Sequence, residues 1–160
     1  MDRFLRFTLR LSRWANGIAG ISLAFMVFIT VCDVILRSFR RPIPGAYELV
    51  GFAGAVVIGF SLPFTSWIGG HIRVDFLIQM FSRRWKRIMN ISTRILGIFF
   101  FILGGVYLFK VGMSLHEAGE VSLTLKMPFY PVTYGLGICC FVQCLVLLCD
   151  IVKILGGENE

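Results

Sequence analysis

Three ionisable residues near the ends of two apolar segments have the clearest capacity for chemistry in this sequence. Asp33 and Arg37 are four residues apart, a spacing that lets an acid and a base meet on a helix. Glu48 follows a short break and opens the next apolar segment. Because an ionisable group at the edge of a membrane is costly unless it is paired or reaches water, we predict a local network of these three residues that fixes a turn between two helices. The alternative is that they contact another protein or an anionic ligand.

Two further arginines occupy the turn itself. Arg40 and Arg41 precede Pro42, Pro44 and Gly45, which are residue types that disfavour a continuous helix. If Arg37 and Glu48 pair to anchor the turn, these two arginines remain free to meet a partner protein, a binding protein or a lipid phosphate. Their charge would also raise the local concentration of an anionic substrate by electrostatic steering.

Metal and cofactor chemistry finds little support in the sequence. His71 and His116 are the only histidines and lie outside the apolar segments, whereas a b-type haem needs histidines inside a helical bundle. No nucleophile–base motif, phosphate-binding loop or zinc motif is present. We therefore predict no metal, no cofactor, no enzyme activity and no nucleic-acid binding. The cysteines all lie within apolar runs and form no CxxC pair: Cys32, Cys139, Cys140, Cys144 and Cys149.

The elements that must position these residues are membrane-spanning helices. The chain has 160 residues, of which 57% are hydrophobic and only 16% charged, whereas soluble proteins have about 25% charged residues. A spanning helix needs about 20 mostly apolar residues. Four segments qualify, and we predict a single all-α integral membrane domain over residues 1–160 with these spans: 15–36, 47–67, 89–111 and 130–152.

A fifth helix is predicted between the second and third spans. Residues 72–87 are too few to cross a membrane, and at 100° per residue their apolar side chains share one arc while Asp75 and other polar residues fall on the opposite arc. Such a helix lies in the interface plane, with Trp85 at headgroup depth and basic residues against anionic lipid. Docking on a partner subunit is an alternative that does not exclude the first.

Basic residues predict the orientation, because they concentrate in cytoplasmic segments. Both termini are placed in the cytoplasm, since the side that carries them has eleven lysines and arginines against five on the other side. The five on the outer side are Arg37, Arg40, Arg41, Lys110 and Lys126.

Small residues in the second span predict close helix packing. Gly51, Ala55 and Gly59 recur at four-residue spacing, which lets helices approach by van der Waals contact, within the chain or against a partner. Gln143 is almost the only strongly polar side chain well inside a span. A carrier that acts alone holds its substrate near the midplane, so the chain is expected to need a partner for transport.

Three stretches, taken in order, resemble the small membrane subunit (DctQ type) of tripartite ATP-independent periplasmic (TRAP) transporters. They read DVILRSFRRPIPGAYEL at 33–49, GGHIRVDFL at 69–77 and EVSLTLKMPFYPVTYGLG at 120–137. The resemblance implies four spans with a horizontal helix, in the bacterial inner membrane. It also implies a large membrane subunit and a periplasmic binding protein as partners, and sodium-driven uptake of an organic anion such as a carboxylate, sialic acid or sulfonate.

In that resemblance the small subunit is a static brace beside the scaffold of the large one, and whether the complex forms a dimer stays open. The family's positions carry over onto residues with structural or subunit-contact roles: Asp33, Arg37, Glu48, His71, Asp75, Ser122, Leu125 and Pro128. Two alternatives remain. One is a membrane anchor for a redox enzyme, and the other is a small self-associating carrier.

Overall fold

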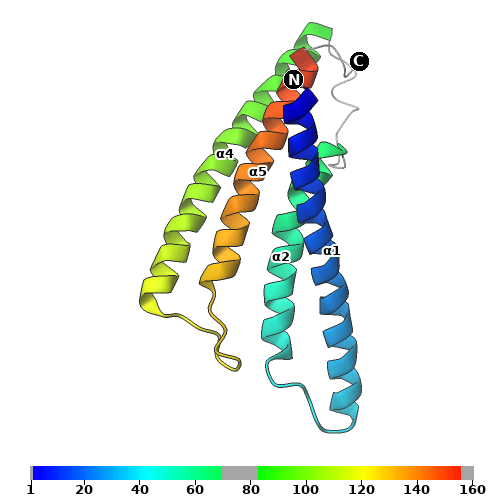
Figure 1. The fold of residues 1–160 in the computed structure, drawn as a ribbon, viewed down its shortest axis with the longest axis vertical. Coiled ribbons are helices and arrows are strands. Elements are labelled where there is room, and N and C mark those ends of the chain that lie inside the picture. Colours follow the sequence, from blue (N-terminus) through cyan, green and yellow to red (C-terminus); the bar gives the residue numbers. More distant parts are fainter. Residues whose placement is uncertain (1, 70–82, 156–160) are drawn as a thin grey trace.

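The fold is a pair of antiparallel helical hairpins packed side by side (Figure 1). The computed structural model describes residues 2–69 and 83–155. In the first hairpin α1 (Asp2–Ser38) packs against α2 (Ala46–Trp67). In the second, α4 (Arg83–Ala118) packs against α5 (Tyr130–Leu155). Each of these helices is long and apolar enough to cross a membrane, which confirms the prediction of an all-α membrane protein.

Two helices extend well beyond the predicted spans. α1 begins at Asp2 and α4 begins at Arg83, so residues 83–87 open α4 and do not end a separate interfacial helix. The physical reason is that a formed helix propagates at little cost until a breaker stops it, and no proline interrupts either extension. The rest of the predicted interfacial helix, with His71 and Asp75, lies outside the described residues.

The two hairpins meet mainly along α2 and α5, and α1 reaches α5 through fewer contacts. α5 therefore lies between the other helices, and its inward side carries small residues such as Cys144, Val146 and Cys149. Glycines allow the close approach: a Cβ at Gly137 would lie 2.8 Å from a ring carbon of Phe109, and one at Gly59 would overlap the side chain of Leu136. Both close contacts are possible only because glycine has no side chain.

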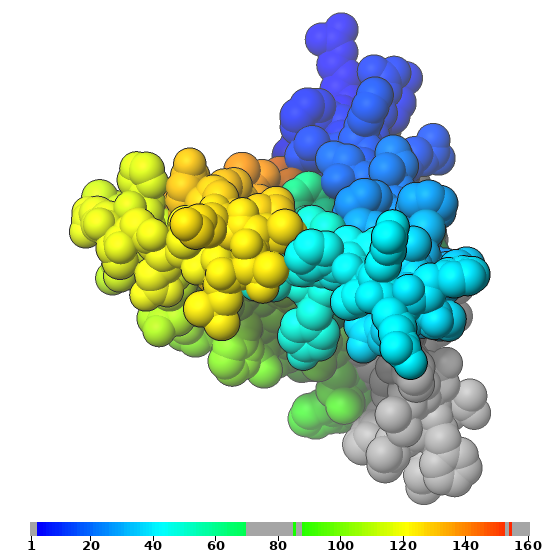
Figure 2. All heavy atoms as spheres, turned by 90° about the horizontal axis from the view of Figure 1, so that it is seen from below, coloured from blue at the N-terminus to red at the C-terminus, as the bar shows by residue number. Residues whose placement is uncertain are grey.

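The two described loops lie at the same end of the molecule, opposite the ends of α1 and α5 that carry the chain termini (Figure 1). Viewed from that end, the turn between α1 and α2 lies beside the loop between α4 and α5 (Figure 2). Following the orientation predicted from the basic residues, we call this the outer end and the opposite one the inner end. The outer end is where most of the residues singled out in the sequence are found.

Candidate functional site: polar ties within and between the hairpins

Asp33 closes the turn of the first hairpin. Arg37 Nη2 donates a hydrogen bond of 2.6 Å to Asp33 Oδ2, and the backbone N–H of Ile43 donates one of 2.9 Å to Asp33 Oδ1. The residue is 8% exposed. The structure thus brings Asp33 and Arg37 together at the spacing that favours an ion pair, and the same carboxylate fixes the path of the turn.

Glu48 does not join that pair, contrary to the expectation from the sequence. Its Oε1 accepts a hydrogen bond of 2.7 Å from the N–H of Thr124, and its Oε2 accepts one of 3.0 Å from the N–H of Leu125. These donors belong to the loop between α4 and α5, more than 70 residues away in the chain. Hydrogen bonds to a charged acceptor are stronger than neutral ones, so Glu48 ties the first hairpin to the second.

Hydrogen bonds within the loop between α4 and α5 fix the backbone that contacts Glu48. Ser122 Oγ accepts a hydrogen bond of 3.1 Å from the N–H of Met127, and the N–H of Ser122 donates one of 2.9 Å to the carbonyl of Met127. Lys126 adopts a left-handed conformation with φ of 53°, a region uncommon for residues other than glycine. Ser122 is buried, so it closes the loop from inside.

The other residues of the outer-loop motif have different positions. Leu125 packs against Gly45, where a Cβ would overlap the leucine side chain and where φ is +75°. That backbone conformation suits glycine because it has no Cβ. Pro128 forms an isolated antiparallel bridge with Val121 and is exposed. Ser122 and Leu125 therefore hold the loop against the first hairpin, while Pro128 stays at its surface.

The outer arginines lie at the surface of the turn between α1 and α2. Both Arg40 and Arg41 are exposed. Arg40 adopts a left-handed conformation with φ of 58°, and the N–H of Arg41 donates to the carbonyl of Leu36. The backbone of this turn is thus ordered while its two guanidinium groups face outward.

Only part of the row of small residues in α2 makes close contacts with another helix of the chain. Gly59 is buried against Leu136 of α5, whereas a Cβ at Gly51 would meet nothing within 4 Å. Ala55 is half-buried beside the same hollow that Gly59 lines. Close packing inside this chain therefore occurs at the Gly59 end of the row.

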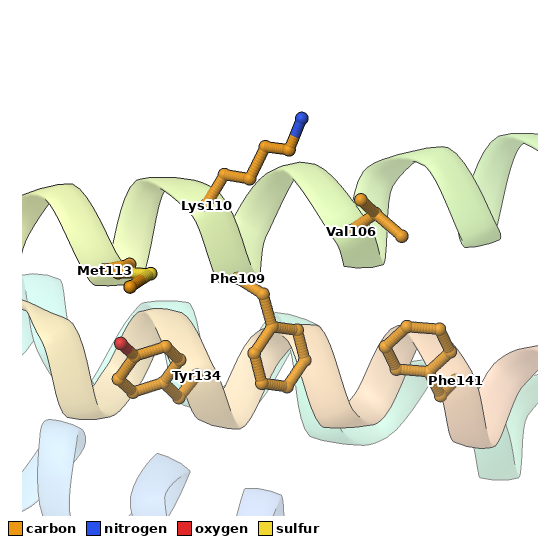
Figure 3. Close-up of a pocket in the computed structure, with 6 residues that line it drawn as sticks. All are labelled: Val106, Phe109, Lys110, Met113, Tyr134 and Phe141. Atoms are coloured by element: carbon orange, nitrogen blue, oxygen red, sulfur yellow. The ribbon is translucent and has the colours of Figure 1, made fainter.

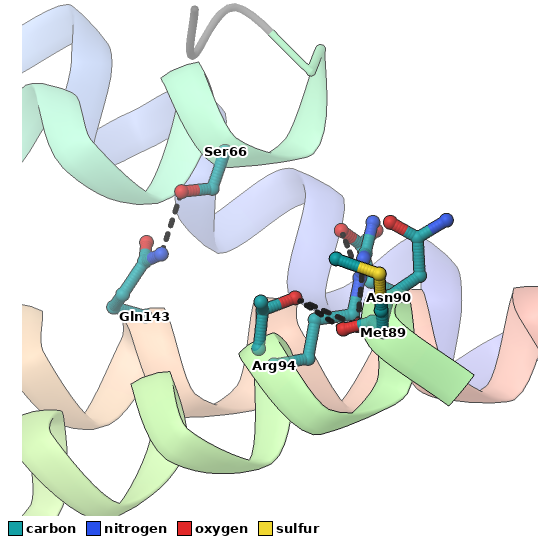
Figure 4. A network of polar contacts seen from close by, with 7 residues as sticks. Ser66, Met89, Asn90, Arg94 and Gln143 are labelled. Atoms are coloured by element: carbon teal, nitrogen blue, oxygen red, sulfur yellow. Dashed lines mark hydrogen bonds and ion pairs between the residues drawn. The ribbon is translucent and has the colours of Figure 1, made fainter. Parts of the chain in front are cut away.

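Two polar pairs inside the helices were not predicted (Figure 4). Gln143 Nε2 donates a hydrogen bond of 2.6 Å to Ser66 Oγ, between α5 and α2. Arg94 Nε lies 3.4 Å from Asp150 Oδ2, between α4 and α5, with both side chains less than 15% exposed. The only sequence signal was the presence of each polar residue within an apolar helix, which identifies one partner but not the other.

A third unpredicted contact lies at the inner end. Cys149 Sγ donates a weak hydrogen bond of 3.6 Å to Thr8 Oγ1, between α5 and α1. Thr8, Ser12 and Cys149 are all buried. The N-terminal extension of α1, which the sequence analysis left outside the first span, is therefore part of the packed structure.

Weakening the Glu48 contact should loosen the outer loop. In Glu48→Gln one of the two acceptor oxygens becomes an amide NH₂, which cannot accept the N–H that the carboxylate held. We expect the amides of Thr124 and Leu125 to exchange with deuterium several-fold faster, because those hydrogen bonds protect them. Hydrogen–deuterium exchange of the purified protein measures this change. Glu117→Gln, in the exposed last turn of α4, is the control; equal acceleration in both variants would contradict the assignment.

The polar contacts described above join helices and loops to one another. Within residues 2–69 and 83–155, no group of three histidine, cysteine or acidic side chains is placed to bind a metal ion. His116 instead packs edge-on against Tyr130, with ring centroids 4.7 Å apart.

A comparison with known families identifies the class of protein. Residues 26–157 match the family model described as "Tripartite ATP-independent periplasmic transporters, DctQ component". No curated protein sequence matches the chain. The family is a transporter component and not an enzyme, and it associates with a large membrane subunit and a periplasmic binding protein. Together with the four apolar helices, this makes the chain a multi-pass inner-membrane protein. The chain belongs to the DctQ family, as the small membrane subunit of a TRAP transporter.

Proposed function

We propose that this subunit is a static brace for the scaffold of the large membrane subunit, in sodium-driven uptake of an organic anion delivered by the binding protein. The observation that carries the proposal is that the two hairpins are tied at three depths. Glu48 holds the loop at the outer end, Ser66 and Gln143 meet between α2 and α5, and Thr8 contacts Cys149 at the inner end. A body tied at three depths resists the rigid-body movement that a transport domain undergoes.

The surface of the chain supports the same role. Large apolar side chains along α1 and α4 are exposed, including Phe28 at 67% and Phe100 at 61%. In a membrane such faces contact lipid or another helix. The substrate is then carried by the large subunit, and Arg40 and Arg41 remain available at the outer surface for the binding protein. Contacts of the 72–87 segment with anionic lipid belong to the same proposal, and a dimer of the complex is compatible with it.

The proposed orientation places both termini in the cytoplasm. Arg94 and Lys110 both lie inside the predicted span 89–111 and inside α4, so neither belongs to a segment that flanks the span. Leaving both out changes the eleven and five basic residues of the two sides to ten and four. The bias toward cytoplasmic termini is therefore kept.

A covalent lock between the hairpins tests the brace. The rings of Phe52 in α2 and Phe129 beside α5 have centroids 5.1 Å apart, so cysteines at these positions can be cross-linked in a chain whose native cysteines are replaced by alanine. Because the hairpins are proposed not to move against each other, we expect uptake by the reconstituted transporter to be unchanged by the lock. The substrate is first chosen as an organic acid that raises the thermal stability of the binding protein. Uptake of that acid, in labelled form, is then measured.

The same double variant without cross-linker is the control for the two substitutions. Loss of uptake on cross-linking, with the large subunit still bound, would show that the hairpins move during transport and would contradict the brace. If the wild-type chain is purified from its native membrane without a large subunit, the proposed association with that subunit is itself contradicted.

A further inference from the structure

One face of α1 at the inner end carries a row of exposed cations. Arg3, Arg6 and Arg10 are three and four residues apart, a spacing that places them on one side of a helix. All three are exposed, and so is Phe7, which lies among them. In the part of the chain that the structure describes, no ion pair involves Arg3 or Arg10. We call these four residues the arginine face.

Packing on the opposite side of the helix fixes the direction of the arginine face. Thr8 and Ser12 are buried, and Thr8 contacts Cys149 of α5. At 100° per residue, these two residues lie roughly opposite Arg3 and Arg10 on the helix. α1 therefore holds the arginine face away from the bundle, toward whatever surrounds the subunit.

The contacts of α5 give the depth of this part of α1. Gln143 of α5 is hydrogen-bonded to Ser66, near the inner end of α2, and Cys149, six residues later, contacts Thr8. Because α1 runs antiparallel to α5 (Figure 1), the residue of α1 level with Ser66 lies about six residues after Thr8, which is Trp14. Trp14 is 75% exposed. Exposed tryptophan is typical of the boundary between the apolar layer and the headgroups.

The arginine face begins just beyond that boundary. Arg10 is four residues from Trp14, roughly 6 Å along the helix, and the headgroup layer is about 5–8 Å thick on each side of a membrane. Phe7 is exposed one turn further along α1. Arginine and exposed phenylalanine on one helix face are typical of a segment at the boundary of headgroups and acyl chains.

On the membrane side of Trp14 the same face of α1 is apolar. Ile18, Ile21 and Phe25 are exposed, and their spacing continues the line of the arginine face toward the outer end. We call these three residues the apolar stripe. α1 thus carries cations at headgroup depth in line with exposed apolar side chains inside the membrane. An anionic phospholipid has the complementary order of parts, a negative headgroup followed by acyl chains.

A hollow against the arginine face has a lining that suits a negative group. Its volume is about 620 Å³, and the described residues that line it are Arg3, Arg6, Phe7 and Arg10. The groove formed by α4 and α5 is different, since apolar side chains such as Val106, Phe109 and Phe141 line nearly all of it (Figure 3). Guanidinium groups match the geometry of phosphate oxygens. The hollow on α1 therefore favours a phosphate, which the apolar groove does not.

We propose that the arginine face binds the headgroup of an anionic phospholipid, whose acyl chains lie along Trp14 and the apolar stripe. Free phosphate shares the chemistry of the headgroup but has no part that would cover the apolar stripe. The inference goes beyond the proposed brace, because it concerns the contact of α1 with the membrane and does not require the large subunit. Basic pockets at the cytoplasmic side of membrane proteins bind anionic headgroups in this way.

Quenching of Trp14 fluorescence by brominated lipids tests the proposal. The full chain with Trp67→Phe and Trp85→Phe keeps Trp14 as its one tryptophan. It is reconstituted in vesicles of equal parts phosphatidylglycerol and phosphatidylcholine, with bromine on the acyl chains of one lipid or the other. We expect phosphatidylglycerol to bind beside Trp14 about tenfold more tightly than phosphatidylcholine, because several arginines attract its negative headgroup.

Two pairs of substitutions with the same loss of charge locate the site. Arg3→Gln with Arg10→Gln should lower the preference to about twofold or less. Arg40→Asn with Arg41→Gln removes two charges from the outer turn, where asparagine tolerates the left-handed backbone, and should keep the preference. Quenching with bromine on both lipids should be equal in all variants, which shows that Trp14 still faces lipid in a folded chain. A preference that survives Arg3→Gln with Arg10→Gln would overturn the proposal.

Other occupants of the arginine face give different results, and each would overturn the proposal. If the preference is absent but inorganic phosphate binds the detergent-solubilised chain through Arg3 and Arg10, the face takes a free anion. If the preference appears only after Glu158→Gln with Glu160→Gln, acidic residues of this chain cover the face. If the complex with the large subunit retains equal amounts of anionic lipid with and without Arg3 and Arg10, as measured by native mass spectrometry, an acidic segment of the partner covers it.

Discussion

Replacing Arg94 with leucine is expected to lower the free energy of unfolding by about 3–5 kcal/mol, the largest effect of a single substitution that we foresee. The guanidinium is held by Asp150 at 3.4 Å and donates a 3.0 Å hydrogen bond from Nη1 to the carbonyl of Asn90. Both charged side chains are less than 15% exposed. Removal of one leaves a buried charge without its partner, and that penalty exceeds the net gain of forming the pair.

The double variant Arg94→Leu with Asp150→Leu separates this penalty from the value of the pair. It should recover most of the lost stability, because apolar replacement of both partners of a buried pair is often neutral or stabilising. Thermal unfolding in detergent of the wild type, the two single variants and the double variant completes the cycle. If the double variant is as unstable as the sum of the singles, the two side chains act independently and the pairing is wrong.

Gly59→Val should lower the free energy of unfolding by about 1–3 kcal/mol, the usual range for overpacking a well-packed site. The added side chain would overlap Leu136, so α2 and α5 would have to move apart where the two hairpins meet. Loss of stability in the same detergent assay, together with weaker protection of the Ser66–Gln143 region from hydrogen exchange, is the expected result.

Gly51→Val is the matched control, since both glycines belong to the same predicted row and the same helix. A Cβ at Gly51 meets nothing within 4 Å, so only the small difference in helix propensity between glycine and valine should appear. Similar destabilisation by both variants would mean that intrinsic helix preference, and not contact with α5, decides the outcome.

The fold follows from the sequence to a large extent because hydropathy is a local property. α2 and α5 begin within one residue of the predicted apolar segments, since a turn or loop rich in breakers precedes each. Asp33 and Arg37 could also be paired from spacing alone, because both partners lie on one helix. The length of α1 was harder to predict from the sequence. Its N-terminal extension is amphipathic, and the side with Thr8 and Ser12 is buried only because α5 packs against it.

The candidate site was less predictable because its partners are distant in the chain. Glu48 was assigned to a network with Asp33 and Arg37, yet its carboxylate accepts hydrogen bonds from the backbone amides of residues 124 and 125. Backbone donors carry no sequence signature, so the expected network could not have been corrected from residue types. Arg94 and Lys110 were counted among the charges of the two sides although both fall inside the predicted span 89–111, since their depth depends on how α4 is aligned with α5.

The contact between Thr8 and Cys149 has a consequence for biosynthesis. The two residues are 141 positions apart, so α1 completes its packing only after α5 has been synthesised. In the interval the hydroxyls of Thr8 and Ser12 are already bonded to carbonyls one turn earlier, at 3.1 and 2.9 Å. Because of these local bonds, the hydroxyls of the nascent chain are satisfied in the membrane before α5 has been made. Chains that end before α5 would therefore expose this surface to membrane proteases, which links completion of translation to survival of the subunit.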